Sequence, residues 1–343
     1  MPRALVLGGT GQVGVAVARR LLAAGWDVDL TGRNPPRLEV EGARFVLSDR
    51  TNADDLRTAF GSGADLLVDN VCYTAEQARL VLPFAAAAGS TVMLSSKAVY
   101  VDTAGNHTNS DVRPRFDGPI RETQPTMAPG DMPYDSREGY GANKVAAEHV
   151  FLDSGLPVTV IRPSKVHGPG ATRPREWHFV KRVLDRRPVV LFAHRGEGAD
   201  HPTAAANIAA LVEVAAARPG QRILNCADPD APNGLEISRT VARRLGHEWD
   251  EVLVDGDEPG GHPWDVLPPI ALDMTAAAEL GYVPAGDYAT TVAEEVDWLV
   301  ESGEPPDEEF FASSFDYAAE DSYLEAIGRP TTSASRSAGS TDA

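Results

Sequence analysis

The sequence has little cysteine, a deficit of positive charge and no long hydrophobic run. Its 343 residues include two cysteines, which are too few for a disulfide framework and lack the spacing of metal ligands. Lysine and arginine number 31 against 50 aspartates and glutamates, which gives a formal net charge of −19. This balance argues against nucleic acid and anionic membrane surfaces as partners, because both are bound through clustered cations.

Membrane spans and targeting signals are lacking as well. No apolar run approaches the roughly 18 residues that cross a bilayer. Residues 1–7 lack the apolar region and the cleavage site of a signal peptide. The composition therefore predicts a reduced, cytoplasmic, soluble protein. Hydrophobic residues make up 43% of the chain, which is enough to bury a sizeable core.

The first half of the chain alternates short apolar strands with helices. Strands are expected at 4–7, 28–31, 43–47, 66–68, 91–94 and 158–161, and helices at 11–24, 54–60, 75–88 and 140–152. Such alternation is typical of a parallel sheet with helices on both faces. The predicted fold class is α/β, a doubly wound parallel sheet followed by a smaller, mixed α/β region.

A glycine-rich turn lies between the first strand and the first helix. Gly8, Gly11 and Gly14 form the pattern G-x-x-G-x-x-G, and Gly9 with the last two forms G-x-G-x-x-G. Glycines allow a tight turn and a close approach to a pyrophosphate, which then lies at the helix N-terminus. A strand before and a helix after are the context that this motif requires. The sequence therefore predicts a Rossmann-type dinucleotide site at Gly8, Thr10, Gly11, Gln12, Val13 and Gly14.

The residue at the end of the second strand indicates whether the site prefers NAD or NADP. An acidic residue at its tip would bind the ribose hydroxyls of NAD, whereas an arginine accommodates the 2′-phosphate of NADP. Asp29 lies inside the strand, while Arg33, followed by Asn34, occupies the tip. We therefore expect NADP as the preferred cofactor and NAD as the alternative.

An acid–base pair is indicated farther along. Tyr140 and Lys144 are four residues apart on one face of a helix. A neighbouring ammonium stabilises the phenolate and so lowers the pKa of a tyrosine. On spacing alone, the pair would be an ordinary exposed tyrosine and lysine. The strand at 91–94, however, is followed by Ser95 and Ser96 at the carboxyl edge of the sheet, where open α/β sheets bind ligands.

Four short motifs occur in the first 169 residues. They are the glycine turn at 8–14, Ser-Ser-Lys-Ala-Val-Tyr at 95–100, Tyr-Gly-Ala-Asn-Lys at 140–144 and Ile-Arg-Pro-Ser-Lys-Val-His-Gly-Pro at 161–169. In this order and spacing they resemble the extended short-chain dehydrogenases/reductases, the NAD(P)-dependent epimerase/dehydratase group. The similarity extends to about residue 300.

The resemblance implies roles for individual residues. Tyr140 would be the general acid/base, Lys144 would hold the nicotinamide ribose and tune the tyrosine, and Ser96 would donate a hydrogen bond to a substrate carbonyl. Further cofactor contacts are implied for Asp49, Arg50, Val71, Cys72, Pro163, Ser164 and Val166. The resemblance also implies a homodimer formed through the helix that carries Tyr140.

Departures from the family pattern bear on the substrate. The family's 4,6-dehydratases have Thr-Asp-Glu where this chain has Ser96-Lys97-Ala98, so a typical 4,6-dehydratase is not expected. Lys165 stands where many sugar-nucleotide enzymes have an asparagine that contacts the diphosphate. The residues expected to bind substrate are Lys97, Lys165, Trp177 and His178. The histidines lack metal-ligand spacing, so no metal is expected.

The expected domains are a dinucleotide-binding domain at 1–162 and a mainly substrate-binding region at 163–304. The first includes a long loop at 101–139, of the kind that forms lids and binding loops. The second has helices expected near 176–186, 204–217, 235–245 and 290–300. An acidic, aromatic extension at 305–330 is expected to pack onto the body, and 331–343 to be disordered.

These patterns predict an NAD(P)-dependent oxidoreductase or epimerase. It would transfer hydride at a hydroxyl or carbonyl carbon of a small polar metabolite, for which a sugar derivative is one option. The alternative is a non-catalytic NADP-binding regulator or scaffold of the same fold, which the intact Ser96, Tyr140 and Lys144 disfavour.

Overall fold

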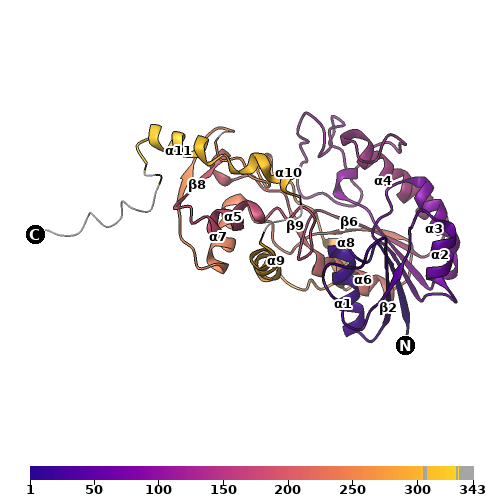
Figure 1. The fold of residues 1–343 in the computed structure, drawn as a ribbon. Helices are drawn as coiled ribbons and strands as arrows, with labels where there is room; N and C mark the ends of the chain where they lie inside the picture. The colour runs from indigo at the N-terminus through magenta and orange to yellow at the C-terminus, as the bar shows by residue number, and fades with distance from the viewer. Residues whose placement is uncertain (258, 304–306, 330, 332–343) are drawn as a thin grey trace, which may run out of the picture.

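A parallel sheet of seven strands forms one end of the molecule (Figure 1). The computed structural model describes residues 1–257, 259–303, 307–329 and 331. The strands of the sheet are β1 (Arg3–Leu7), β2 (Asp27–Gly32), β3 (Arg44–Leu47), β4 (Leu66–Asp69), β5 (Ser90–Leu94), β6 (Val158–Pro163) and β10 (Arg222–Cys226). Their order is β10-β6-β5-β4-β1-β2-β3, so the direction of winding reverses between β1 and β4. The predicted α/β, doubly wound fold is confirmed.

Helices cover both faces of this sheet. One face carries α1 (Gln12–Ala23) and α6 (Ala205–Ala217), and the other carries α2 (Ala53–Phe60), α3 (Ala75–Ala87) and α4 (Arg137–Leu152). Side chains alternate along β1, so that Ala4 and Val6 face the first pair of helices while Leu5 and Leu7 face the other three. Two apolar layers therefore enclose the sheet.

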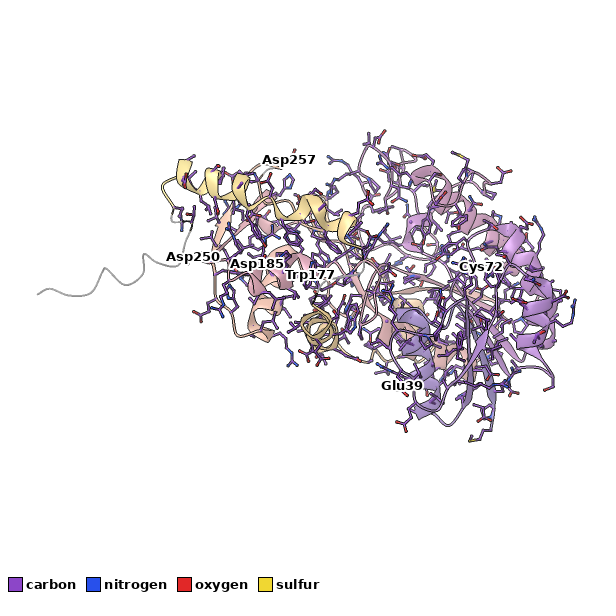
Figure 2. All side chains as sticks on the ribbon, viewed as in Figure 1. Glu39, Cys72, Trp177, Asp185, Asp250 and Asp257 are labelled. Carbon is purple, nitrogen blue, oxygen red and sulfur yellow. The ribbon has the colours of Figure 1, made fainter. Side chains whose placement is uncertain are left out.

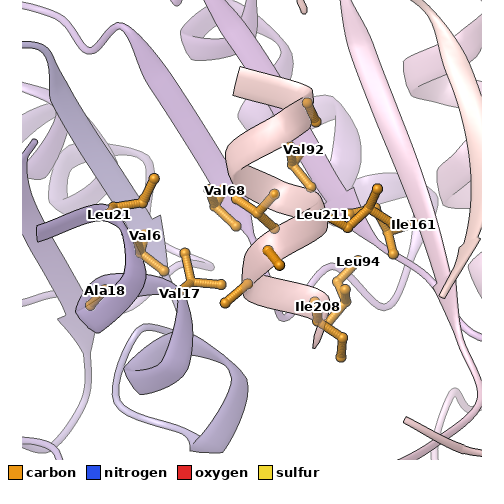
Figure 3. Packing of buried hydrophobic residues seen from close by; sticks show 14 of the residues in the cluster. Val6, Val17, Ala18, Leu21, Val68, Val92, Leu94, Ile161, Ile208 and Leu211 are labelled. Atoms are coloured by element: carbon orange, nitrogen blue, oxygen red, sulfur yellow. The ribbon is translucent and has the colours of Figure 1, made fainter. Parts of the chain in front are cut away.

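The layer between the sheet and the helix pair α1 and α6 is tightly packed. Val17 and Leu21 of α1 and Leu211 of α6 are fully buried, and they pack against Val6 and Val68 of the sheet (Figure 3). Burying a side chain of this size stabilises the fold by about 1.5–3 kcal/mol. The periodic apolar residues that predict these helices are thus the ones that attach them to the sheet.

The second group of elements occupies the opposite end of the molecule (Figure 1). Its helices are α5 (Trp177–Leu184), α7 (Gly234–Arg244) and α9 (Tyr288–Ser302), around a core that includes Phe179, Phe192 and Trp264. Two short parallel pairs accompany them, β8 (Val189–Phe192) with β11 (Asp250–Leu253) and β7 (Lys165–His167) with β9 (Pro202–Ala204). Short helices are η1 (Lys97–Val99), η2 (Ala193–Gly196) and α8 (Thr275–Glu279).

The extension after residue 305 is helical where it is described. It consists of α10 (Glu308–Phe311), η3 (Ala312–Phe315) and α11 (Tyr317–Ala326). Leu324 is fully buried against the β8–β11 pair, and Arg182 of α5 forms a 2.5 Å ion pair with Glu320. The disorder expected for 331–343 concerns residues that, except for Thr331, lie outside the described ones.

The two regions share part of the chain. Residues 205–226, which the sequence assigns to the mainly substrate-binding region, supply α6 and the edge strand β10 to the large sheet. The local sequence of β10 gives no signal for its place in the sheet, because its neighbour β6 comes from a distant part of the chain. In the described ranges, no helix combines the length and apolar character that a membrane span requires.

The long segment at 101–136 is attached to the rest of the molecule at a few points, and it carries only isolated bridges. The Asp102 carboxylate accepts hydrogen bonds from the backbone N–H groups of Ala104, Asn106 and Arg115. Ile120 pairs with the segment around Leu272, which belongs to the second region. The loop therefore connects the two regions beside the carboxyl edge of the sheet, where β5 leads into it.

Candidate active site

The glycine turn brings helix α1 very close to the sheet. A Cβ atom on Gly14 would lie 2.4 Å from Gly9 Cα, and one on Gly9 would lie 2.6 Å from Leu30 Cδ2. Gly8 has a φ of +68°, which favours glycine. Gly11 precedes α1 and no side chain caps the helix, so the N–H groups of its first turn are open to a ligand. This cradle suits a pyrophosphate group.

Polar atoms at the same edge of the sheet have no protein partner among the described residues. They are Gln12 Nε2, both polar atoms of the Asn70 side chain and Ser164 Oγ, all enclosed. Gln12 begins α1, Asn70 follows β4 and Ser164 follows β6. Enclosed polar atoms are normally hydrogen-bonded, so their grouping here fits a bound polar molecule such as a dinucleotide.

Tyr140, Ser96 and Lys144 meet at this carboxyl edge. The Ser96 hydroxyl lies close enough to Tyr140 to lower the pKa of its phenol group. Lys144 Nζ donates to the carbonyls of Cys72 (2.8 Å) and Leu94 (2.9 Å), at the ends of two neighbouring strands. Helix α4 begins at Arg137, three residues earlier than expected, because Ser136 caps it by accepting from the Gly139 N–H.

An aromatic cluster surrounds the lysine. Its ammonium nitrogen lies 4.6 Å from the ring centroid of Tyr73, and the Tyr73 ring stacks on Tyr134 at 5.1 Å. The Tyr140 ring centroid is 6.5 Å from that of Tyr73. Sequence reasoning did not find Tyr73, because a tyrosine that follows a strand carries no motif of its own.

The pKa shifts of Tyr140 and Lys144 differ from those expected from the sequence. Burial raises the pKa of Tyr140 above its ordinary value, and the hydrogen bond with Ser96 offsets this only in part. Burial lowers the pKa of Lys144, an effect that the neighbouring Tyr73 opposes. The ammonium is directed to the two backbone carbonyls, and it lies 6.0 Å from the Tyr140 ring centroid. The lowering of the tyrosine pKa predicted from helical spacing is therefore not what this arrangement produces.

A family-wide comparison identifies the relationship that this geometry suggests. The model of the NAD dependent epimerase/dehydratase family matches residues 4–199, more than half of the chain. This chain belongs to that family. The resemblance expected from the four motifs is thereby confirmed.

Individual members of the epimerase/dehydratase family provide more detail. The 2′-dehydrokanamycin reductase of Streptomyces kanamyceticus is 32% identical over 175 residues, which are 49% of this chain and 44% of the reductase. The chain therefore aligns with less than half of that relative's length.

Solved structures of this family share the fold. The UDP-glucose 4-epimerase of Thermotoga maritima, solved with UDP-glucose, has a TM-score of 0.67 at 16% identity and covers 88% of this chain and 100% of its own. A dTDP-glucose 4,6-dehydratase of Bacillus anthracis, solved with NAD, has a TM-score of 0.64 at 16% identity and covers 88% and 97%. At such identities the likeness shows the fold alone.

The carboxylate within β2 is occupied by two arginines. Asp29 is buried, and its oxygens accept from Arg3 Nε (2.8 Å) and Arg44 Nε (2.7 Å). Burial would raise the pKa of Asp29, but the hydrogen bonds and charges of the two arginines outweigh it and hold the pKa below its ordinary value. Arg33, directly after the last residue of β2, is exposed, as is Asn34.

The other residues expected to contact the cofactor lie around the same edge. Val71 packs on the glycine turn, since its Cγ1 is 2.6 Å from where a Cβ on Gly8 would be. Arg50 forms an ion pair with the buried Asp69 at the end of β4. Asp49 accepts from the Thr51 N–H at 2.9 Å. Pro163 ends β6, and Val166 of β7 packs against the core beneath α6.

The two adjacent serines have different partners. Ser95 Oγ donates to Glu148 of α4, which also holds Arg162 through a 3.0 Å bond from Nε. Ser96 Oγ accepts from the Ala98 N–H at 3.2 Å and lies close enough to Tyr140 to affect the pKa of its hydroxyl. Ser96 is thus the serine on the side of the tyrosine.

The residues expected to bind substrate separate into two groups. Lys97 and Lys165 come together on Asp200, which no sequence motif indicated. Trp177 and His178 are buried in the packed core of the second region, where the His178 ring is 4.9 Å from that of Phe179. Figure 2 shows Trp177 in that region and Cys72 in the sheet-bearing one.

A buried acidic cluster lies behind β7. His167, Glu176 and Glu295 bring ligand atoms within 4.8 Å of one another, a spacing that could hold a metal ion. Each also has protein partners: His167 Nε2 is 2.8 Å from Asp228 Oδ2, and Glu295 Oε2 accepts from the Gly168 N–H at 2.6 Å. Burial and the neighbouring Glu176 raise the pKa of Glu295 well above its ordinary value, so a proton held there relieves the repulsion.

The two cysteines are expected to be unreactive in the folded protein. Burial raises the pKa of Cys72 to about 12 and that of Cys226 still further, and the thiolate is the reactive form. A colorimetric thiol reagent should therefore detect neither thiol near neutral pH and both after unfolding in guanidinium. Rapid reaction of one thiol in the native protein would contradict this packing of the strand ends.

Proposed function

We propose that the chain is an NAD(P)-dependent oxidoreductase or epimerase that acts on a hydroxyl or carbonyl carbon of a small polar, sugar-like metabolite. The observation that carries the proposal is the meeting of Tyr140, Ser96 and Lys144 at the same carboxyl edge of the sheet as the uncapped glycine turn. Two hydroxyl groups and a lysine thus lie at the edge that carries the dinucleotide cradle. That is the arrangement required for proton transfer to a carbonyl oxygen.

In the reductive direction, Tyr140 and Ser96 both donate hydrogen bonds to the substrate carbonyl oxygen. The nicotinamide cofactor, when bound, supplies the hydride. The proton of the Tyr140 hydroxyl moves to the oxygen as negative charge develops on it, and the Ser96 hydroxyl stabilises that charge. The raised pKa of Tyr140 keeps the group protonated at neutral pH, which suits reduction. Lys144, fixed by two carbonyls, would hold the ribose side of the cofactor.

One feature of the sequence favours reduction or epimerisation over dehydration. Water elimination by the route of the 4,6-dehydratases requires an acidic pair after the serine, and here Lys97-Ala98 occupies those positions. Because one relative is named as a 2′-dehydrokanamycin reductase, 2′-dehydrokanamycin is the first compound to test. UDP-glucose, present in the epimerase structure, is the second.

The first experiment uses the protein as purified from the cell. It is denatured, any released nicotinamide cofactor is identified, and separate samples are titrated with NADPH and NADH. A retained, oxidised cofactor supports an epimerase that returns its hydride. An empty site that binds NADPH and consumes it with a carbonyl compound supports a reductase. Binding of neither dinucleotide would overturn the proposal, and binding without turnover of either compound class would favour a regulator or scaffold.

A preference for NADP is part of the proposal, as are a cytoplasmic location and a homodimer formed through α4. With Asp29 occupied by two arginines, Arg33 is the charged group at the tip of β2. Arg33→Ala should weaken NADPH binding by roughly 10-fold, since a charge-assisted hydrogen bond is lost. NADH binding should be unchanged. Arg37→Ala, which removes an exposed arginine nearby, is the control; equal losses for both dinucleotides would refute the assignment.

A further inference from the structure

Lysine is rare in this chain and concentrated at the site. The sequence has four lysines, and three of them, Lys97, Lys144 and Lys165, lie at or next to the carboxyl edge of the sheet. The side chains of Lys97 and Lys165 are 6% and 14% exposed. Arginine supplies almost all the other positive charge of the protein.

One carboxylate serves two of these lysines. Lys97 Nζ forms an ion pair with one oxygen of Asp200, and Lys165 Nζ lies 2.9 Å from the other. Asp200 is itself 4% exposed in its side chain. Lys165 also donates to the Pro263 carbonyl. Each ammonium has three N–H donors, so donors of both lysines remain for a further acceptor.

The cluster contains two lysines for one carboxylate. The Arg175 guanidinium is close enough to lower the pKa of both lysines. Glu176 opposes that effect at Lys165, whereas Arg113 adds to it. Burial lowers the pKa of Lys97 to about 7. The second lysine therefore loses its proton easily, and an added negative group would favour its charged form.

The cluster lies beside the reacting groups. Lys97 directly follows Ser96 and begins η1, and Lys165 follows Ser164 at the start of β7. Ser96 in turn lies close enough to Tyr140 to affect the pKa of its hydroxyl. The lysine cluster and the reacting groups therefore extend from the same end of β5.

We propose that Lys97 and Lys165, which are bridged by Asp200, form an anion subsite. This subsite binds a carboxylate or phosphate group of the substrate near its reacting carbon. The inference rests on the proposed function, because it assigns the subsite to the same substrate. Charge-assisted hydrogen bonds to two ammoniums give such a group both affinity and a fixed orientation. The substrate class is thereby narrowed to acidic or phosphorylated hydroxy and keto compounds.

The competing explanation is that the three residues form a purely structural ion-pair network. The balance of charges in the cluster predicts different results for the network and for the anion subsite. Lys165→Met leaves Lys97 and Asp200 as a neutral pair, and Lys97→Met leaves Lys165 and Asp200. Neither single variant should therefore lower the midpoint of thermal unfolding. A network that serves only stability would show the reverse, a lowered midpoint with unchanged anion binding.

The test is calorimetric titration of the protein saturated with NADPH, using inorganic phosphate in one arm and glycolate in the other. Saturation with the dinucleotide keeps the probes away from the pyrophosphate cradle. Each lysine variant should bind the preferred anion at least roughly 10-fold more weakly than the wild type, for the loss of one charged hydrogen bond. Lys181 is the fourth lysine of the chain and lies on α5, away from this cluster. The Lys181→Met variant should therefore leave the anion affinity unchanged.

The two arms identify the source of the negative charge. Tighter binding of phosphate indicates a phosphorylated substrate, and tighter binding of glycolate an acidic one. Tyr140→Phe should bind the anion as the wild type does, so failure of the proposed chemistry would leave this result intact. Equal anion affinity in the wild type and both lysine variants would overturn the subsite, even where NADPH binding and turnover are normal.

Discussion

Tyr140→Phe is expected to lower kcat by roughly 10²–10⁴-fold, the range of a positioned proton donor. The variant lacks the hydroxyl that lies near Ser96 but keeps the ring that packs near Tyr73. The structural change is confined to one oxygen, so the affinity for NADPH should be largely unchanged. Steady-state kinetics with an accepted carbonyl compound and a fluorescence titration with NADPH measure the two quantities.

Tyr134→Phe is the matched control for this experiment. Tyr134 stacks on Tyr73 at 5.1 Å and is exposed, so it shares the aromatic cluster without facing Ser96. Its variant should retain the wild-type kcat. Undiminished turnover of Tyr140→Phe would show that another group delivers the proton, and a large loss of NADPH binding would show that the ring or its hydroxyl positions the cofactor instead.

Glu148→Gln is expected to lower the free energy of unfolding by about 3–5 kcal/mol, the cost of leaving one partner of a buried ion pair unpaired. Glu148 and Arg162 have side chains that are 1% and 4% exposed, and they form a 2.5 Å ion pair. The guanidinium also lies 4.8 Å from the centre of the Tyr100 ring. The amide keeps the shape of the glutamate but not its charge, so the buried cation loses its counter-charge.

Equilibrium unfolding in urea measures this loss, and Asp54→Asn supplies the comparison. Asp54 pairs with Arg57 on the surface of α2 and has a side chain that is 84% exposed, so its removal should cost no more than about 1 kcal/mol. Similar losses for the two variants would contradict the assignment of Glu148 as the counter-charge of the buried arginine beneath Ser95.

Local patterns in the sequence predict most elements of the large sheet. The expected strand at 91–94 is β5, at Ser90–Leu94, and the expected helix at 75–88 is α3, at Ala75–Ala87. These predictions succeed because each segment buries one stripe or face, and the spacing of apolar residues records that burial directly. The start of α4 was placed three residues late because its cap, Ser136, precedes any apolar residue.

The spacing of apolar residues does not show which distant segments of the chain pack together. Strand β10 joins the sheet beside β6, although 63 positions separate Cys226 from its strand partner Pro163. The partners of the buried charges are equally remote: Lys97 and Asp200 lie 103 positions apart. Spacing along the chain gives no information about such pairs, because ion pairing depends on which segments the core brings together.

The amino-acid sequence by itself determined the glycine cradle, the family motifs and the placement of Tyr140 and Lys144 on one helical face, whereas the roles of Ser96, Tyr140 and Lys144 stay predictions. These depend on short-range spacing, which a strand, a turn or one helical face translates directly into geometry. Only the tertiary structure decided that Ser95 faces Glu148, that Lys144 is held by two carbonyls, and that Asp200 joins two enclosed lysines. The physical reason is that burial sets the cost of each charge, and burial exists only after the segments have packed.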